Sequence, residues 1–374
     1  MQLDEIISLL DRTPIIAEMH PVSACYLPDE IMIFESTHDI FFEMDNPSPT
    51  LPAKMLVMAS DIVCAERFPR TICEHNPFTP ILNEILFDRF DCVSKRMFCQ
   101  SQITERIVAN TRQSPEVEVI VLFLIDGLSY QNSVQHIGGK HSNLSIEPCL
   151  VDVPTFTSLA FPNIINDPPL ALRLFDMGYQ NALGVSYWTR DDNTLTDSLF
   201  RTIPQVEKIS DFQHILFVIE RFLKDHPKQK VYVQVLRTGL DGYVHHQKRQ
   251  PPIRAIIHQI YQELELLGEL FTRLGLNAQL YSTSDHGILW RDEFEAELVG
   301  NAPGKSSARW CTWKDLYQQN EPGKRFVVNQ QEYYCLGYPK LRRALHIDEQ
   351  GVHGGISFQE SIVPFITMGG VEHD

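Results

Sequence analysis

The sequence predicts an α/β protein in which helices flank a mostly parallel central sheet. Two continuous apolar runs, Val119–Ile125 and Val231–Leu236, have the composition of strands that are buried on both faces of a sheet. A third predicted strand, Ala278–Ser284, follows a long predicted helix. Strands that alternate with helices favour a parallel sheet with right-handed crossovers.

The long predicted helix lies between the second and third of these strands and ends at Gly275, because glycine suits the position that follows a helix. Its apolar residues recur at a spacing of three or four, which places them on one helical face. These residues are Ile256, Ile257, Ile260, Leu264, Leu267, Phe271 and Leu274. The pattern therefore predicts an amphipathic helix with one buried side.

Residues 1–115 differ from the rest of the chain and are predicted to form an N-terminal accessory region of mixed α and β structure. This region contains no residue pattern that indicates a chemistry. It holds a helix-like segment, Leu3–Leu10, two strand-like runs, Ile31–Glu35 and Asp39–Met44, and a linker, Asn46–Pro52. The α/β alternation begins after it, so a second domain is predicted over residues 116–374.

Two stretches of this second domain interrupt the alternation of strands and helices. They span about residues 187–230 and 289–346, and both are polar, contain aromatic residues and are rich in loop-forming residues. We interpret them as insertions that cap the site.

The composition predicts a cytoplasmic globular protein whose net charge repels long polyanions unless a local basic patch offsets it. Lys and Arg total 32 against 48 Asp and Glu, which gives a formal net charge of −16. This charge disfavours wide duplex binding and favours a small phosphate ester or the end of a nucleic acid strand. The longest apolar run is shorter than the ~20 residues that cross a bilayer. The eight cysteines form no C-x-x-C pair, and the N-terminus lacks the basic region of a signal peptide.

Residues that can bind a divalent metal occur at five places, each at the end of a predicted strand or in a loop. They are Asp126, Thr157, Asp241 with His245, Asp285 with His286, and His353, and His246 is an alternative to His245. In parallel α/β sheets the loops beyond the carboxyl ends of the strands form the site, so distant residues converge there. Carboxylates, imidazoles and one hydroxyl suit two adjacent metal ions, an arrangement that serves phosphoryl displacement.

The order of these residues resembles that of the alkaline phosphatase superfamily. Residues 353–364 resemble the closing signature of one branch of it, the PglZ domain, which Ser357, Glu360 and Pro364 match. The resemblance covers residues 117–368 and implies an alkaline phosphatase-like catalytic domain over 116–374. It assigns one metal to Asp126, Thr157, Asp285 and His286, and the other to Asp241, His245 and His353. It also implies two Zn²⁺ ions, and these ligand types would accept Mn²⁺ as well.

Thr157 is the predicted nucleophile, because residues 154–157 match the family pattern Pro-Thr-x-Thr with the second threonine in that role. A cation that binds a hydroxyl lowers its pKa and makes it a better nucleophile. A second alignment stays open, since residues 160–163 resemble the Thr-Phe-Pro-Asn of nucleotide pyrophosphatases. That register places Ala160 at the nucleophile position and predicts an inactive protein. Thr155 and Ser158 are further candidates.

Four residues are candidates for substrate binding. Tyr187 and Trp188 follow a predicted strand and resemble the aromatic position that nucleotide phosphodiesterases place near the site. Stacking a base on an aromatic face contributes roughly 1–3 kcal/mol. Lys305 and Arg309 follow the Asp285-His286 pair and could hold phosphate oxygens. A packing role for the aromatic pair and a solvated loop for the cations are the alternatives.

The residues and the resemblance together favour a metal-dependent phosphodiesterase or nuclease-like hydrolase that acts on nucleotide or oligonucleotide diesters. A phosphomonoesterase or phosphate mutase with the same metals is the alternative enzyme. A non-catalytic PglZ-like binding or scaffold module is the alternative outside enzymes. PglZ-type domains resemble components of phage-defence and regulatory systems, so the resemblance also implies a protein partner.

Overall fold

The computed structural model describes two compact units, Met1–Met97 and Phe98–Asp374. The described residues are 16–18, 22, 32–34, 55–57, 71–73, 80–137, 144–187, 193–244, 249, 251–300, 302, 306–312 and 323–368. The sequence analysis divides the chain at residue 115, whereas residues 98–115 fold with the larger unit. The reason is α6 (Ile103–Gln113), whose buried residues Ile103 and Ile107 join a core cluster of that unit.

The smaller unit contains two pairs of parallel strands and two helices among its described residues. The pairs are β1 (Ile16–Glu18) with β4 (Thr71–Cys73) and β2 (Met32–Phe34) with β3 (Met55–Val57); the helices are α4 (Pro80–Asp88) and α5 (Phe90–Arg96). Strand β2 lies inside the predicted run Ile31–Glu35. The predicted segments Leu3–Leu10, Asp39–Met44 and Asn46–Pro52 lie outside the described residues. The accessory role of this unit stays a prediction.

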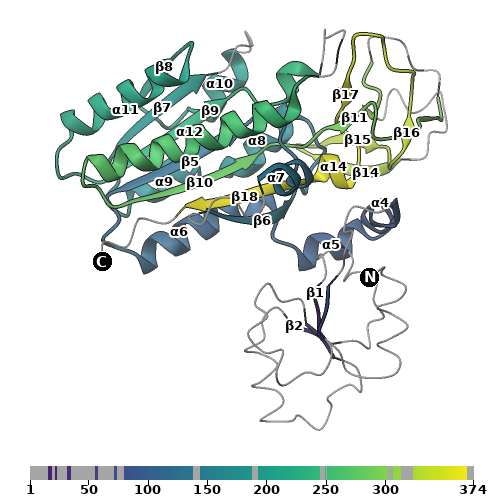
Figure 1. Cartoon of the computed structure of the whole chain (residues 1–374), viewed down its shortest axis with the longest axis horizontal. Helices are drawn as coiled ribbons and strands as arrows, with labels where there is room; N and C mark the ends of the chain where they lie inside the picture. Colours follow the sequence, from purple (N-terminus) through teal and green to yellow (C-terminus); the bar gives the residue numbers. More distant parts are fainter. Residues whose placement is uncertain are drawn as a thin grey trace. The chain divides into compact units, whose positions relative to one another are not determined.

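The larger unit is built on a seven-stranded central sheet, which confirms the predicted α/β class (Figure 1). The strand order is β6-β18-β10-β5-β9-β7-β8. Neighbours from β10 to β8 run parallel, and β18 runs antiparallel to both of its neighbours. The strands are β5 (Val119–Ile125), β6 (Leu144–Leu150), β7 (Asn181–Tyr187), β8 (Gln205–Lys208), β9 (Val231–Arg237), β10 (Ala278–Ser284) and β18 (Ile362–Met368).

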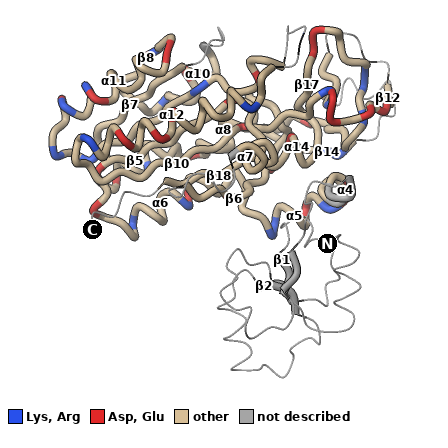
Figure 2. The backbone as a smooth tube through the Cα atoms, viewed as in Figure 1, with Lys and Arg blue, Asp and Glu red and all other residues tan. Residues whose placement is uncertain are grey.

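Helices cover both faces of the central sheet and divide its core into two clusters. Successive strand residues point to opposite faces, so Phe123 joins the first cluster and Leu122 joins the second. Helices α11 (Phe212–Asp225) and α12 (Ile253–Arg273) pack in the first cluster; α6, α8 (Thr157–Ile165), α9 (Leu170–Phe175) and α10 (Asn193–Leu199) pack in the second. Because both faces are covered, β5 is buried along its whole length and carries no charge (Figure 2).

Helix α12 is the long helix that the sequence predicts. Its predicted apolar face is buried from Ile256 to Phe271, and Leu274 is its C-cap. Gly275 has a φ of +67°, and Leu276 N–H donates to the Phe271 carbonyl at 3.0 Å, which closes the last turn. None of the helices in the described part of the chain, α12 included, combines the length and apolar character needed to cross a membrane.

The sequence analysis assigns about residues 187–230 to a cap insertion, and the structure corrects this assignment. Strand β8 pairs with β7 at the edge of the central sheet. Helix α11 buries Phe212, Ile215 and Ile219 in the first core cluster. The helical spacing of these residues is the signal that identifies α11 as part of the α/β layers.

The second predicted insertion, about 289–346, forms small sheets outside the central sheet. Strand β11 (Leu289–Trp290) pairs with β17 (Gly351–Val352), and β12 (Glu297–Leu298) pairs with β16 (Lys340–Leu341). Strands β13 (Trp310–Thr312), β15 (Gln331–Cys335) and β14 (Lys324–Val328) form a three-stranded antiparallel sheet, here called the outer sheet. Its role as a cap over the site stays a prediction.

The carboxyl ends of β10, β5 and β9 lie side by side. Ser284, Ile125 and Arg237 are register partners across these three strands. Asp285 and Asp126 directly follow two of them, and Asp241 begins the short helix η2 (Asp241–Tyr243) after the third. The turn after β5 packs closely against η2, so that a Cβ added to Gly127 would lie 2.8 Å from Asp241 Cβ. The parallel topology therefore delivers the three aspartates to one edge.

A pair of glycine substitutions tests this close approach. Gly127 and Gly275 both have a positive φ, where an L-residue is destabilised by about 1–2 kcal/mol. A Cβ on Gly275 would meet nothing within 4 Å. We therefore expect Gly127→Ala to lower the free energy of unfolding by roughly 1–3 kcal/mol more than Gly275→Ala, as measured by urea denaturation. Equal losses would contradict the contact between the β5 turn and Asp241.

Candidate metal centre

Two overlapping groups of metal-ligating side chains lie at the carboxyl edge of the sheet. Asp126, Asp285 and His286 form the first ligand group, and Asp241, His286 and His353 form the second ligand group. Within each group the ligand atoms lie within 4.8 Å of one another. The structure thus brings these sequence-predicted residues together. Of the other two predicted ligands, Thr157 lies beside His286, and His245, with its alternative His246, lies outside the described residues.

Asp285 is buried and held by the backbone of its own turn and of the β5 turn. Its Oδ1 accepts hydrogen bonds from the N–H of Gly127 at 3.0 Å and from the N–H of His286 at 2.9 Å. Burial raises the pKa of Asp285 to about 7, and the charge of Asp241 adds to this rise while the two amide donors oppose it. A positive ion beside the carboxylate would stabilise its charged form and so lower this pKa.

The two histidines are oriented by hydrogen bonds to backbone carbonyls. His286 Nδ1 lies 3.0 Å from the Gly287 carbonyl, and His353 Nδ1 lies 3.1 Å from the Thr155 carbonyl. Because a carbonyl only accepts, each Nδ1 carries the proton and each Nε2 is left as a lone-pair donor to a metal. The rings stack with centroids 4.0 Å apart. Burial, followed by the charge of His286, lowers the pKa of His353 and favours the neutral ring that a metal needs.

His286 belongs to both ligand groups, but its Nε2 can bind only one ion. That nitrogen lies 3.2 Å from Thr157 Oγ1 and 3.4 Å from Asp285 Oδ2. In the second group, His353 Nε2 lies 3.2 Å from Asp241 Oδ1. The second group therefore has two ligands of its own and needs a further one from outside the two groups.

Thr157 is the first residue of α8, and its hydroxyl contacts the first ligand group. Its Oγ1 hydrogen-bonds with Asp285 as well as lying near His286. The first N–H groups of a helix have no partner within it, and together with the helix dipole they favour negative charge at this end. A phosphoryl oxygen placed near Thr157 would meet this positive helix end.

The other nucleophile candidates lie in different surroundings. The Thr155 hydroxyl donates to the Gly355 carbonyl at 2.7 Å and accepts from Gly354 N–H at 3.0 Å, so it holds the loop that carries His353. Ser158 is exposed. Ala160 is fully buried and belongs to the second core cluster.

Two residues without a predicted role form hydrogen bonds that hold the Asp285 turn. Gln100 Nε2 donates to the carbonyls of Ser284 and Asp285 at 2.7 and 2.8 Å. The Ser284 hydroxyl accepts from Leu128 N–H at 2.8 Å. The position of Ser284 directly before Asp285 is a usable signal in the sequence. Gln100 gives no such signal, because its contact with Asp285 spans 185 residues.

Arg309 does not lie where a substrate could meet it. Its guanidinium is fully buried and pairs with Glu360, with Nε–Oε1 at 3.1 Å and Nη2–Oε2 at 2.6 Å. Its Nη1 donates to the carbonyls of Gly337 and Lys340. The sequence analysis treats Arg309 as a free cation, and the structure corrects this, because the side chain supports the site from within. Lys305 lies outside the described residues.

Tyr187 is the last residue of β7 and is half-buried against the first core cluster. Its carbonyl accepts hydrogen bonds from the N–H and the hydroxyl of Thr238, both at 3.2 Å. Trp188 lies outside the described residues, so a stacking role for this pair stays a prediction.

An aromatic cluster that the sequence analysis does not predict adjoins Thr157. The ring of Phe156 stacks on Trp310 of the outer sheet, with centroids 4.5 Å apart and an angle of 17°. Tyr333 contacts both rings edge-on at 5.4 and 5.8 Å. Trp310 and Tyr333 remain partly exposed. The pairing of β13 with β15 brings these residues together, and no short-range pattern encodes that pairing.

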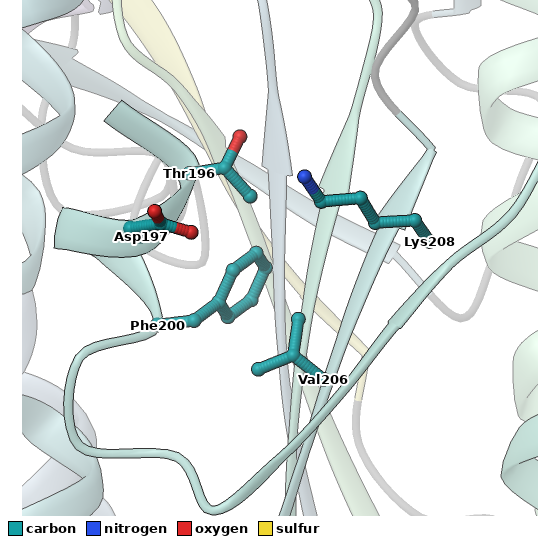
Figure 3. A pocket seen from close by; sticks show the side chains of 5 residues that line it. All are labelled: Thr196, Asp197, Phe200, Val206 and Lys208. Atoms are coloured by element: carbon teal, nitrogen blue, oxygen red, sulfur yellow. The ribbon is translucent and has the colours of Figure 1, made fainter. Parts of the chain in front are cut away.

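A separate pocket of about 450 Å³ lies between α10 and β8 (Figure 3). Phe200 and Val206 give it apolar surface, and Asp197 and Lys208 give it one charge of each sign. It shares no residue with either ligand group. The pocket therefore contributes nothing to the metal centre.

The donor set fits divalent cations. Asp126, Asp241 and Asp285 are fully buried, and close buried carboxylates repel one another unless positive charge compensates them. Two imidazole Nε2 atoms point into the same region. Carboxylate and imidazole ligands suit Zn²⁺ and also accept Mn²⁺. The residues therefore match the ion types that the sequence analysis expects.

Comparisons with known proteins find solved structures that resemble this chain, but they assign it to no family. No protein-family model matches this sequence, and no curated protein matches it. Several solved structures resemble this chain over about two thirds of its length. Murine ectonucleotide pyrophosphatase/phosphodiesterase 5, an inactive form in complex with AMP, has a TM-score of 0.46 and 13% identity over 68% of this chain and 88% of its own.

Two bacterial structures show the same kind of likeness. Phosphonoacetate hydrolase from Sinorhizobium meliloti 1021, in complex with phosphonoformate, has a TM-score of 0.40 and 14% identity over 70% of this chain and 92% of its own. The C-terminal periplasmic domain of EptC from Escherichia coli, in complex with Zn, has a TM-score of 0.36 and 11% identity over 69% of this chain and 74% of its own. At these scores the likeness transfers no residue role to this chain.

The raised pKa of Asp285 predicts a pH effect on the metal-free protein. Folding moves this pKa from 3.8 to about 7, so the folded state binds more protons in that window and its stability falls as pH rises through it. Asp285→Asn cannot ionise and keeps an oxygen for Gly127 N–H. The free energy of unfolding falls by at most about 1.4 kcal/mol per pH unit for one proton. We therefore expect the metal-free Asp285→Asn variant to lack this pH-dependent loss of stability.

Urea denaturation from about pH 4 to about pH 8 measures the effect of Asp285→Asn. Asp176→Asn, at an exposed aspartate, is the matched control and should follow the wild-type profile. Parallel profiles for the wild type and the Asp285→Asn variant would contradict the burial of an ionising carboxylate at this position.

Proposed function

We propose that this chain is a metal-dependent phosphodiesterase that cleaves nucleotide or oligonucleotide diesters with Thr157 as its nucleophile. The observation that carries the proposal is the hydroxyl of Thr157 lying 3.2 Å from His286 Nε2, beside two contiguous ligand groups. A nucleophile, buried acidic ligands and a positive helix end within one small region are the parts that phosphoryl transfer requires.

The residues divide into those that hold metal and those that react. Asp126, Asp285 and His286 would hold one ion beside Thr157; Asp241 and His353, with His245 or His246, would hold the other. When bound, the two ions supply positive charge that lowers the pKa of a coordinated hydroxyl and neutralises charge on the transferring group. Residues of the chain supply the nucleophile and the hydrogen-bond donors.

In the proposed reaction the Thr157 oxygen attacks phosphorus in line with the leaving oxygen. The new O–P bond forms as the bond to the leaving group breaks, the departing oxygen takes up the proton that Thr157 loses, and a phosphodiester of Thr157 remains. Water then attacks the same phosphorus and the Thr157–phosphorus bond breaks, which restores the hydroxyl. The N-terminal amides of α8 stabilise the negative charge on the phosphoryl oxygens throughout.

The charge of the site supports a diester substrate. A monoester dianion carries more charge than a diester and needs more positive groups around it. Arg309, one of the two predicted substrate cations, is already neutralised by Glu360. The net charge of −16 further disfavours a dianion. The partly exposed Trp310 and Tyr333, with Tyr187 and Trp188, support a substrate that carries a base.

The PglZ resemblance of residues 353–364 supports a place for the chain in that branch of the superfamily. Glu360 of this stretch bonds the N–H of Gly355 at 2.9 Å, so the matching residues form one folded unit with His353. Membership of the branch, and with it a protein partner in a defence or regulatory system and a cytoplasmic location, belongs to the proposal. We take Thr157 rather than Ala160 as the nucleophile position, because the Thr157 hydroxyl lies 3.2 Å from His286 Nε2.

Removal of the Thr157 hydroxyl tests the nucleophile. We expect Thr157→Ala to lower turnover of a diester by roughly 10³-fold or more, the order of loss for a removed nucleophile, while most of the metal stays bound by the other ligands. Ser158→Ala changes the next hydroxyl, which is exposed, and should keep near wild-type activity. Steady-state kinetics with metal analysis of each variant give the answer, and an active Thr157→Ala enzyme would rule out this nucleophile.

Substrate preference tests the diester assignment. With both metals supplied, we expect kcat/KM for bis-p-nitrophenyl phosphate to exceed that for p-nitrophenyl phosphate by at least about tenfold, or about 1.4 kcal/mol. The reason is the small cationic charge that the described site offers beyond its metals. Trp188→Ala should raise KM for nucleotide diesters and leave p-nitrophenyl substrates nearly unchanged. A monoester preference in the wild type would instead favour the phosphomonoesterase alternative.

A further inference from the structure

We infer that Arg309 is a positioning residue that holds His353 in the second ligand group through its buried ion pair with Glu360. The inference rests on the proposed function, because it concerns how the metal centre is assembled. Both side chains are completely buried. Buried charges are tolerated only with good geometry and further hydrogen bonds, and one of the groups that bond this pair, the N–H of Gly355, belongs to the loop that carries His353.

Glu360 connects the two histidine loops. Its Oε1 accepts from Gly355 N–H at 2.9 Å, two residues after His353. Its backbone carbonyl accepts from Gly287 N–H at 2.9 Å, one residue after His286. Glu360 lies in the short helix α14 (Phe358–Ser361) and its N–H is capped by Ser357 Oγ at 3.1 Å. One side chain and its backbone therefore bond to both loops that supply imidazole ligands.

The loop that carries His353 lies directly on the guanidinium of Arg309. A Cβ added to Gly355 would lie 2.4 Å from both Nε and Nη2 of Arg309, so only glycine fits there. On its other side the loop is bonded to Thr155, whose carbonyl faces His353 Nδ1 and whose hydroxyl bonds Gly354 and Gly355. The loop is thus held from both sides, by Thr155 and by the Arg309–Glu360 pair.

Arg309 also ties this loop to the segment that carries the outer sheet. Its Nη1 donates to the carbonyls of Gly337 and Lys340, and its carbonyl accepts from Leu336 N–H at 2.8 Å. The next residue, Trp310, stacks on Phe156, the neighbour of Thr157. A planar guanidinium can serve two carboxylate oxygens and these carbonyls at once, which the single ammonium of lysine cannot do. Arg309 is therefore the common partner of the outer segment and the His353 loop.

A second Arg–Glu ion pair in the same part of the chain, with 11% of each side chain exposed, gives a control of the same chemistry. Arg343 pairs with both oxygens of Glu349 at 2.7 Å. Its other described contacts are the carbonyls of Ser306 and Ala344. The two pairs have the same chemistry and similar geometry, but the contacts of Arg343 include no residue of the histidine loops.

The test is a titration of chelated protein with Zn²⁺ alone against a competing chelator. The wild type should show two affinities, and His353→Ala identifies the one that belongs to the second ligand group. We expect Arg309→Lys and Glu360→Gln to weaken that affinity by about 10–100-fold, the usual effect of losing a partner that orients a metal ligand. The affinity of the first ligand group should change far less. Arg343→Lys should leave both affinities at wild-type values.

Three results would overturn the inference. Unchanged Zn²⁺ affinities in Arg309→Lys and Glu360→Gln, with only a lower Tm, would make the pair a purely structural one. An equal loss of both affinities would show general loosening of the site. A wild type that binds no Zn²⁺ would overturn the proposed function together with the inference. In the first two results the wild type still binds Zn²⁺, so they overturn the inference alone. Glu360→Gln keeps the side-chain shape and an acceptor for Gly355, so it carries the test if Arg309→Lys does not fold.

Discussion

The site depends on one electrostatic constraint, the burial of three aspartates at one edge of the central sheet. Asp126, Asp241 and Asp285 are fully buried, and burial raises the pKa of Asp285, with the charge of Asp241 adding to the rise. Three ionised carboxylates at this edge repel one another, and either protonation or a bound cation relieves the repulsion. His286 and His353 present Nε2 atoms to the aspartates, so the same arrangement that strains the metal-free protein is suited to bind divalent ions.

The central sheet and its supporting bonds explain how residues from distant segments meet. Adjacent parallel strands β10, β5 and β9 end at the same edge, which brings Asp285, Asp126 and η2 together. The remaining ligand, His353, precedes the antiparallel strand β18 and is held through Thr155 and the Arg309–Glu360 pair. Thr157 starts α8 beside them, so the proposed nucleophile, both ligand groups and a positive helix end share one location.

Much of the central sheet could be predicted from the sequence, because periodicity and strand composition are local signals. Strands β5 and β9 and helix α12 follow from such patterns, and the convergence of Asp126 and Asp285 follows from parallel topology. Long-range contacts gave no such signal. The residues around Arg309 in the sequence do not show whether its guanidinium faces solvent or Glu360. Gln100 bonds the Asp285 turn across 185 residues. The roles of the site residues remain predictions for the same reason, since sequence patterns define positions and leave reactivity to experiment.

The proposed chemistry requires that this edge of the sheet binds two metal ions. The most direct measurement is anomalous diffraction at the zinc absorption edge from crystals of the full chain grown with Zn²⁺. We expect two anomalous peaks, one among Asp126, Asp285 and His286 and the other beside Asp241 and His353. A well-diffracting crystal with no zinc peak at these residues, or with zinc bound only elsewhere, would contradict this expectation.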